Sequence, residues 1–307
     1  MQRRKCLILA RYVSAKEWLP APVAALSTVN GPAHINLQCN PQLNAIAILP
    51  KPRTHSIVCS TPFDSTTTMF TFIALALALL APLYFVYKPP TVLMRYFQRR
   101  WPDVLWRVDT DKKMVALTID DAPSEHTLEI LEILKANGAA ATFFVIGAHV
   151  AGHEQTLQDV IRAGCELGNH AMHDEPSRSL GAATLVEQVH QVEEMLDAAY
   201  ARAGRPLPPR YFRPGSGFFS TAMRDLMRRL GYRLVLGNIY PHDPQIPYWS
   251  LNARHILSML QPGGIIICHD GRAWTAPMLR KVLPEVVRRG YRVVTVSTLL
   301  KETGQDS

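Results

Sequence analysis

From residue 111 onward, short apolar runs alternate with stretches in which apolar residues recur every three or four positions. The short runs are rich in β-branched and aromatic residues, which is typical of buried β-strands. The longer stretches predict amphipathic helices that each turn one apolar face to the sheet. The predicted strands are Val115–Ile119, Ala141–Ile146, Glu166–Asn169, Arg210–Phe212, Tyr232–Ile239, Gly264–Cys268 and Tyr291–Ser297.

This regular alternation of strands and helices predicts an α/β fold built on a parallel sheet. Seven strand–helix repeats are typical of a closed or nearly closed barrel, so we expect a distorted (β/α)7 barrel over residues 112–300. Residues 301–307 follow the barrel as a short tail.

The segment Met69–Tyr87 contains no charged residue. At about 1.5 Å per residue, a helix of this length crosses a hydrocarbon core of about 30 Å. A buried core helix is the weaker interpretation, because the segment has no polar face. We therefore expect one transmembrane or signal-anchor helix before the barrel, and Met69 is itself a candidate start of the protein.

The segments on either side of Met69–Tyr87 have no barrel-like pattern. Residues 1–68 show scattered prolines and no sustained periodicity, so we expect a poorly ordered leader. Residues 88–111 contain Trp101, Trp106 and several arginines, which suits a juxtamembrane linker at the lipid–water interface.

The positive charge of the chain lies in these flanks. The formal net charge is +8, of which residues 1–68 contribute +5 and residues 88–107 contribute +4. Residues 108–307 therefore carry a net charge of −1. The net charge of the barrel therefore gives no reason to expect that it binds nucleic acid.

The first predicted strand ends in two adjacent carboxylates, Asp120 and Asp121. Two carboxylates this close repel each other, so a site that keeps both ionised needs a cation nearby. A metal held by one Asp would supply that cation, while the other Asp handles protons. A helix N-cap or a turn is the alternative interpretation, because Asp is common in both.

Ionisable clusters follow four further predicted strands. In α/β barrels the working residues lie in loops at the carboxyl ends of strands, and so many clusters on one face are difficult to explain as helix caps. The five clusters are Asp120–Asp121, His170–Asp174, Arg213–Gly217, His242–Asp243 and His269–Asp270. The remaining histidines considered, His149, His153, His190 and His255, are taken as ordinary surface or helix residues.

These clusters match the motifs of a known family. Over roughly residues 112–300 the chain resembles the polysaccharide deacetylase family, also called the NodB homology domain or carbohydrate esterase family 4. The motifs T-F-D-D-G-P, H-[S/T]-x-x-H, R-x-P-x-G and L-x-H correspond to Thr118–Pro123, His170–Asp174, Arg213–Gly217 and Ile267–His269. The fourth motif, D-x-x-D-W, survives only as Asp243, since Trp249 lies too far downstream. Ala122, Gly215 and Asp174 also depart from the family pattern and indicate a divergent branch.

The resemblance implies a bound divalent metal, usually zinc, with cobalt as an alternative, held by one Asp and two His. Asp121 and His170 match the first two ligands. At the third position this chain has Asp174 in place of His, and His173 lies one residue earlier. We favour Asp174 over His173, because its four-residue spacing is that of the family and zinc accepts oxygen as well as nitrogen ligands.

The resemblance also implies roles for the other site residues. Asp120 is the general base that activates water, and Arg213 pairs with it. His269 protonates the departing amine, and Asp243 stabilises its imidazolium form. A backbone N–H near Ser216 stabilises the oxyanion, and Ile267 lines a small pocket for the acetyl methyl group. These positions are read from the matched motifs in this sequence.

The resemblance implies a metal-dependent hydrolase that removes N-acetyl groups from an amino-sugar polysaccharide such as chitin. The alternatives are a non-catalytic polysaccharide-binding barrel, and an esterase or amidase that acts on another acyl group. We expect the barrel to be anchored to a membrane through residues 69–87 and to face the extracellular or luminal side, where such a polymer lies. The basic residues after the span favour the opposite orientation.

Overall fold

The computed structural model describes residues 65–305. By its internal contacts the chain divides into two units, Met1–Thr61 and Pro62–Ser307, and the description concerns the second. The predicted leader, residues 1–68, therefore lies almost wholly outside the described residues. Its last residues, from Ser65, belong to helix α1, which spans Ser65–Tyr87.

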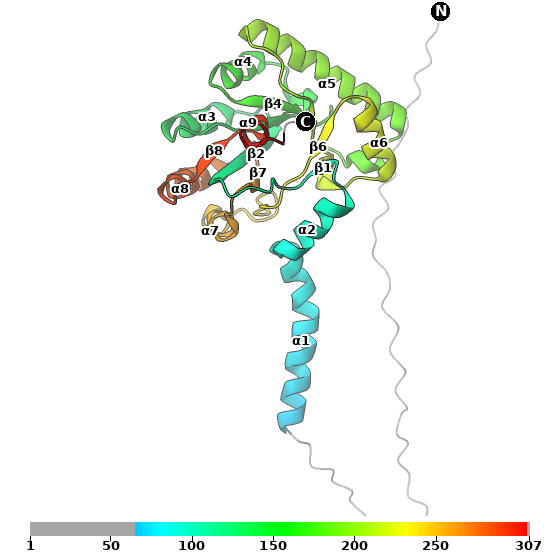
Figure 1. The fold of residues 1–307 in the computed structure, drawn as a ribbon, viewed down its shortest axis with the longest axis vertical. Coiled ribbons are helices and arrows are strands. Elements are labelled where there is room, and N and C mark those ends of the chain that lie inside the picture. Colours follow the sequence, from blue (N-terminus) through cyan, green and yellow to red (C-terminus); the bar gives the residue numbers. More distant parts are fainter. Residues whose placement is uncertain (1–64, 306–307) are drawn as a thin grey trace, which may run out of the picture. The chain divides into compact units, whose positions relative to one another are not determined.

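A parallel sheet forms the centre of the described unit, and helices surround it (Figure 1). Within residues 65–305 the sheet has eight strands. They are β1 (Val104–Leu105), β2 (Met114–Ala122), β3 (Thr142–Val145), β4 (Glu166–Asn169), β5 (Tyr211–Phe212), β6 (Arg233–Val235), β7 (Ile265–His269) and β8 (Arg292–Val294).

The sheet is curled so that its two ends approach each other. The strand order is β1-β6-β5-β4-β3-β2-β7, and β8 pairs with the first residues of β2. Ile239, which follows β6, forms a parallel bridge to Ile266 of β7. This bridge brings the β7 edge next to the β6 side of the sheet, so the predicted distorted (β/α)7 barrel is confirmed.

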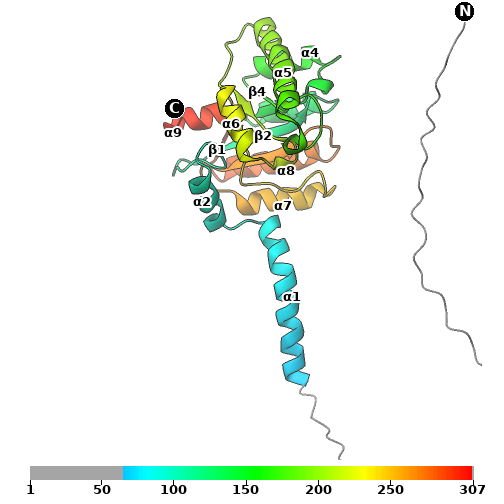
Figure 2. The same cartoon turned by 90° about the vertical axis from the view of Figure 1, so that its right-hand side faces the viewer.

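Most of the helices lie around the curled sheet (Figure 2). After α1 the helices are α2 (Thr91–Arg100), α3 (Thr127–Ala136), α4 (Glu154–Arg162), α5 (Ala182–Ala203), α6 (Thr221–Arg229), α7 (Trp249–Met259), α8 (Thr275–Arg288) and α9 (Val296–Thr303). The last helix, α9, instead lies over the centre of the curled sheet in Figure 1, where Leu299 and Leu300 pack with residues of the strands. Short 3-10 turns are η1 (Gly147–His149), η2 (Ser177–Ser179) and η3 (Gly215–Gly217).

Helix α5 illustrates how the sequence pattern produces an element. Leu185, Val189 and Val192 are buried along one face, as their spacing of three and four predicts. The helix ends at Gly204, whose φ of 67° lies in the left-handed region that glycine adopts without steric cost.

Strand β2 is the centre of the fold, because all nine of its residues are buried. A strand covered on both faces shows no polar alternation, which explains the continuous apolar run in the sequence. Asp120 and Asp121 lie inside this strand and are 4% and 8% exposed. The two carboxylates are therefore buried groups that need partners rather than solvated turn residues.

Two regions differ from the sequence-based prediction. Residues 88–111, predicted as a linker, contain α2 and the strand β1, which pairs in parallel with β6. The two-residue strand is too short to give a periodic pattern. The last predicted strand, Tyr291–Ser297, ends at Val294, because the Thr295 side chain accepts a hydrogen bond from the Thr298 amide and caps α9.

Candidate active site

One cavity lies at the carboxyl ends of β2, β4, β5 and β7, and its volume is about 580 Å³. Most of the predicted site residues line this cavity, namely Asp120, Asp121, His170, Asp174, Arg213, Ser216, Ile267 and His269. Asp243 stands behind His269 and is fully buried. Four strands far apart in sequence thus bring the predicted residues together at one face, as the barrel architecture requires.

Asp120 and Arg213 form the predicted ion pair. The guanidinium Nη1 donates to Asp120 Oδ2 at 3.0 Å, and Nη2 donates to the Thr118 hydroxyl at 3.0 Å. The same guanidinium stacks over the Phe144 ring, so its orientation is fixed from three sides. The other carboxylate oxygen, Asp120 Oδ1, is buried and has no hydrogen-bond partner within residues 65–305. It is therefore the oxygen left to accept a proton.

Asp121 and His170 approach each other across the cavity. The distance from His170 Nε2 to Asp121 Oδ1 is 3.6 Å, and His170 Nδ1 lies 2.7 Å from the carbonyl oxygen of Arg213. A ring N–H at Nδ1 that donates to this carbonyl leaves Nε2 facing Asp121. In the charged ring Nε2 carries a proton toward the carboxylate, and in the neutral ring it offers a lone pair to a metal.

The electrostatics of this pair favour its charged form. Burial alone raises the pKa of Asp121, but the hydrogen bond with His170 and the charges of His269 and Arg272 outweigh it and lower the pKa. Burial lowers the pKa of His170, but the hydrogen bond with Asp121 and the nearby carboxylates raise it above its ordinary value. The site therefore stabilises positive charge beside Asp121.

The third predicted metal ligand does not join this pair. In the described part of the chain, no group of three His, Cys, Asp or Glu side chains is close enough to hold a metal ion. Asp174 and His173 are both exposed, and of the two only Asp174 lines the cavity. Two donors thus fit a metal as they stand, and Asp174 is the better placed of the two candidates for the third.

His269 and Asp243 form the predicted acid pair. Asp243 Oδ1 lies 3.0 Å from His269 Nδ1, and Asp243 Oδ2 accepts the backbone N–H of His269 at 2.8 Å. Burial lowers the pKa of His269, but Asp243, with Asp120 and Asp121, outweighs it and raises the pKa to about 9. The Nδ1 bond leaves the N–H at Nε2 available to an acceptor in the cavity.

The loops around the cavity hold backbone strain. In the part of the chain that the structure describes, four residues other than glycine have a positive φ: Asp121, Ala171, Ser216 and His242. Asp121 lies near the end of β2, and the other three lie in the loops after β4, β5 and β6. Such conformations cost about 1–3 kcal/mol each and cluster at functional sites, where the surrounding structure enforces them.

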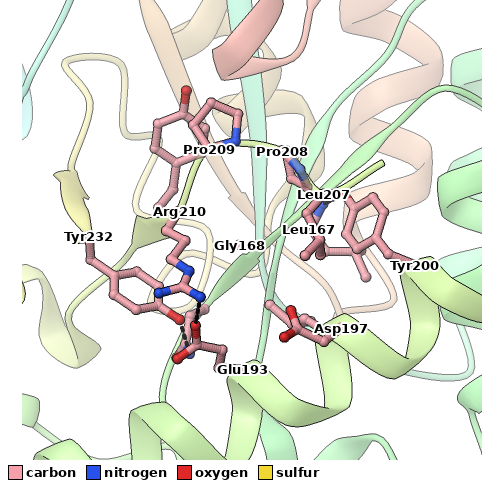
Figure 3. A pocket seen from close by; sticks show the side chains of 13 residues that line it. Leu167, Gly168, Glu193, Asp197, Tyr200, Leu207, Pro208, Pro209, Arg210 and Tyr232 are labelled. Carbon is pink, nitrogen blue, oxygen red and sulfur yellow. Dashed lines mark hydrogen bonds and ion pairs between the residues drawn. The ribbon is translucent and has the colours of Figure 1, made fainter. Parts of the chain in front are cut away.

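A second hollow lies between α5 and the segment that precedes β5, and it is lined by none of the predicted site residues (Figure 3). Its volume is about 40 Å³, which is room for a few water molecules and not for a sugar ring. In Figure 3 the Arg210 side chain reaches the Glu193 carboxylate, with which it forms an ion pair beside Tyr232. We interpret this hollow as a small gap in the side-chain packing and not as a binding site.

Comparison with known proteins places this geometry in a family. The model of the family described as polysaccharide deacetylase matches residues 107–235. A peptidoglycan-N-acetylglucosamine deacetylase from Bacillus cereus is 32% identical over 204 residues, which cover 64% of this chain and 93% of the relative. The chain belongs to the polysaccharide deacetylase family.

Other members of the family match over similar lengths. A chitooligosaccharide deacetylase from Bradyrhizobium is 29% identical over 199 residues, covering 59% of this chain and 88% of that protein. The structure resembles that of a pseudoenzyme of the CE4 family from Bacillus anthracis, with a TM-score of 0.58 and 26% identity, covering 64% of this chain and 68% of the other. The relatives thus include both deacetylases and a protein described as a pseudoenzyme.

One departure from the motifs of the polysaccharide deacetylase family has a steric reason. A Cβ atom added to Gly215 would lie 2.1 Å from the carbonyl oxygen of Glu175. The loop after β5 therefore packs directly on the loop after β4, and the Ser177 hydroxyl accepts the Gly215 amide at 2.8 Å. Only glycine fits this contact, which sets the position of Ser216 at the cavity.

Several side chains that line or adjoin the cavity are not predicted from the sequence. Arg272 lies in the loop after β7, lines the cavity, and donates to Asp121 Oδ2 at 3.3 Å. Tyr240 and the exposed Phe218 also line the cavity. His149, taken as a surface residue, has its Nδ1 2.9 Å from the carbonyl oxygen of Asp121. Arg272 follows the His269–Asp270 cluster by two residues, which is the only signal the sequence offers for it.

Asp270 belongs to a predicted strand-end cluster, but it supports the fold and does not line the cavity. It is fully buried and accepts hydrogen bonds from the hydroxyls of Ser124 and Thr127 and from the amide of Gly271. These bonds tie the end of β7 to the loop between β2 and α3. Helix α3 begins at Thr127, three residues after Ser124.

Proposed function

We propose that the protein is a metal-dependent hydrolase that removes N-acetyl groups from an amino-sugar polysaccharide of the chitin type. The observation that carries the proposal is the presence of two side-chain pairs, a base pair and an acid pair, at one cavity. Asp120 with Arg213 forms a base with a free oxygen, and His269 with Asp243 forms an acid with a free N–H. Deacetylases among the relatives, including one that acts on chitooligosaccharides by its name, support this substrate class.

The base half of the reaction follows from Asp120. A water molecule attacks the acetamide carbonyl carbon while Asp120 Oδ1 takes one of its protons. Arg213 holds the carboxylate through Oδ2, so the proton acceptor does not rotate away. The carbonyl oxygen becomes an oxyanion, and we assign its donor to a backbone N–H near Ser216, which lines the cavity.

The acid half of the reaction follows from His269. As the C–N bond of the tetrahedral intermediate breaks, His269 donates its proton to the departing nitrogen. The products are acetate and a free amine on the sugar. Ile267 and Leu236 give the cavity an apolar side, which suits the methyl group of the acetyl substituent. Each positioned acid or base group contributes about 10²–10⁴-fold to the rate.

Asp121 and His170 fit a divalent metal, because the fixed tautomer of His170 directs one lone pair toward a carboxylate whose pKa is lowered. We assign the third position to Asp174 and the metal to zinc, with cobalt as the alternative. When bound, the metal supplies a Lewis acid that polarises the amide carbonyl and acidifies water.

A change at Asp243 should move the pH dependence of the reaction. His269 must be protonated to act as an acid, and Asp243 is the main cause of its raised pKa. In Asp243→Asn the protonated form is lost at lower pH, so the alkaline limb of the kcat/KM profile moves to lower pH. The measurement is acetate release as a function of pH for both proteins. An alkaline limb that stays in place would show that His269 is not the acid.

The non-catalytic barrel is the second candidate function. The absence of a third donor beside Asp121 and His170 in residues 65–305 favours it, as does the likeness to a protein described as a pseudoenzyme. It does not account for the paired base and acid, since a protein that only binds polysaccharide gains nothing from a buried Asp120–Arg213 pair. Acetate release from acetylated chito-oligomers separates the two candidates.

We also propose that α1 anchors the protein in a membrane. Within residues 65–305 one helical window, Thr68–Tyr87, is long and apolar enough to cross a bilayer, with a mean hydropathy of 2.3, and a signal sequence would pass the same test. We place the catalytic barrel on the extracellular or luminal side, where the polysaccharide is found.

A fragment comparison tests the anchor. Residues 88–307 should be soluble without detergent, whereas the chain with α1 should sediment with membranes and need detergent for extraction. The fragment begins at residue 88 because α2 and β1 belong to the fold. Equal solubility of the two proteins would contradict the anchor.

A further inference from the structure

The acid pair of the proposed reaction is assembled from the end of a strand and from a loop. His269 is in register with Asp120 of β2, so its backbone is held by the sheet. His269 ends β7, whereas Asp243 lies in the long loop between β6 and α7. The bridge between Ile239 and Ile266 joins these segments four residues before Asp243. Beyond this bridge, the distance between the His269 imidazole and the Asp243 carboxylate depends on what holds the end of β7 and the loop that contains Asp243.

The end of β7 and the loop that contains Asp243 are both hydrogen-bonded to the first residues of helix α8. The indole Nε1 of Trp274 donates to the backbone carbonyl of Asp243 at 2.9 Å. The hydroxyl of Thr275 donates to the backbone carbonyl of His269 at 2.7 Å. Trp274 and Thr275 are consecutive, as the N-cap and the first residue of α8, so one helix end contacts the backbone of both members of the acid pair.

We propose that Trp274 and Thr275 are positioning residues for the acid step, which hold His269 and Asp243 at their bonding distance through their backbone carbonyls. This inference rests on the proposed function, because it assigns His269 as the proton donor. Neither residue contacts the reacting atoms, and both act through the acid pair.

The chemistry of the two donors explains why these residue types are needed. The indole N–H is only a donor, and phenylalanine, a smaller aromatic ring without an N–H, leaves the Asp243 carbonyl without this partner. Thr275 is fully buried, so its hydroxyl holds the His269 carbonyl without competition from water. Helix α8 packs against α3 and α7 and is itself firmly placed (Figure 1).

The backbone amide of His269 offers a readout that does not depend on activity. This N–H donates to Asp243 Oδ2 at 2.8 Å, so its protection from hydrogen exchange reports whether the end of β7 and the loop that contains Asp243 stay together. A bond that contributes a typical hydrogen-bond free energy changes the open population by about fivefold to tenfold when it is lost.

The test uses the full chain with Trp274→Phe and Thr275→Val, each compared with a matched control. Thr275→Ser keeps the hydroxyl, and Trp249→Phe makes the same ring change at an exposed tryptophan on α7. We expect Trp274→Phe and Thr275→Val each to lower kcat about fivefold to tenfold with KM unchanged, and to speed exchange of the His269 amide by a similar factor. Both controls should behave as the unmodified protein.

Two results would overturn the inference. The first is unchanged exchange at His269 in both Trp274→Phe and Thr275→Val, since the helix end would then not hold the pair together. The second is faster exchange with unchanged kcat, which would make the bonds structural only. If the unmodified protein releases no acetate, the proposed function fails, and the exchange measurement still decides whether the helix end holds the end of β7 and the loop that contains Asp243.

Discussion

Replacement of Asp120 by asparagine should lower kcat by about 10²–10⁴-fold while the protein keeps its fold and its metal affinity. Asparagine cannot take a proton from water, but its side-chain oxygen can still accept the hydrogen bond from Arg213 at the position of Oδ2. The variant therefore loses the base and keeps a hydrogen-bond acceptor for Arg213, although it no longer neutralises the guanidinium charge. Complete removal of one partner of a buried ion pair costs about 3–5 kcal/mol.

Asp121→Asn is the matched control for this prediction, because it makes the same chemical change one residue along β2. It should lose metal as well as activity, since Asp121 is the carboxylate that faces His170. The measurement is metal content together with acetate release for both variants. Loss of metal in Asp120→Asn with retention in Asp121→Asn would reverse the roles of the two carboxylates.

The second large effect is expected at Asp174. Loss of a direct ligand should weaken zinc binding by more than the 10–100-fold that is typical of residues behind the ligands. We therefore expect Asp174→Ala to lower zinc affinity by more than about 100-fold and His173→Ala to change it little. The reason is position, because Asp174 lines the cavity with Asp121 and His170 and His173 does not.

Competition with a chelator measures both affinities in proteins that differ by one substitution at adjacent positions. If His173→Ala lowers zinc affinity more than Asp174→Ala does, the metal has two histidine ligands. Asp174 then lies near these ligands without binding the metal. If neither change alters affinity, Asp121 and His170 do not form a three-ligand site with this loop. The non-catalytic barrel then becomes the better account.

The parts of the site that the sequence predicted are those fixed by strand pattern. Asp120, His170, Arg213 and His269 each lie at or just after the end of a buried strand, and parallel strands bring their carboxyl ends to one edge. The Asp120–Arg213 and His269–Asp243 contacts were expected from the family motifs and are present as ion pairs. In these cases the local pattern and the architecture determine the position of the side chain.

The parts that the sequence did not predict depend on loop conformation. Arg272 reaches Asp121 from a loop whose sequence has no periodicity. The Trp274 indole donates to a backbone carbonyl, and because every residue has one, the sequence does not indicate this partner. Gly215 departs from the family motif for a contact with the Glu175 backbone that no local pattern encodes. The predicted third metal ligand also depends on loop conformation, because the loop after β4 sets whether Asp174 faces the site.

The central claim is that this barrel hydrolyses N-acetyl groups with a bound metal, and one titration tests it most directly. The purified protein is stripped of metal, zinc is added back in steps, and acetate release from acetylated chito-oligomers is measured at each bound fraction. We expect no release from the stripped protein and a rate that rises in proportion to one bound zinc per chain. A protein that binds one zinc per chain and releases no acetate from any acetylated glycan would contradict the account.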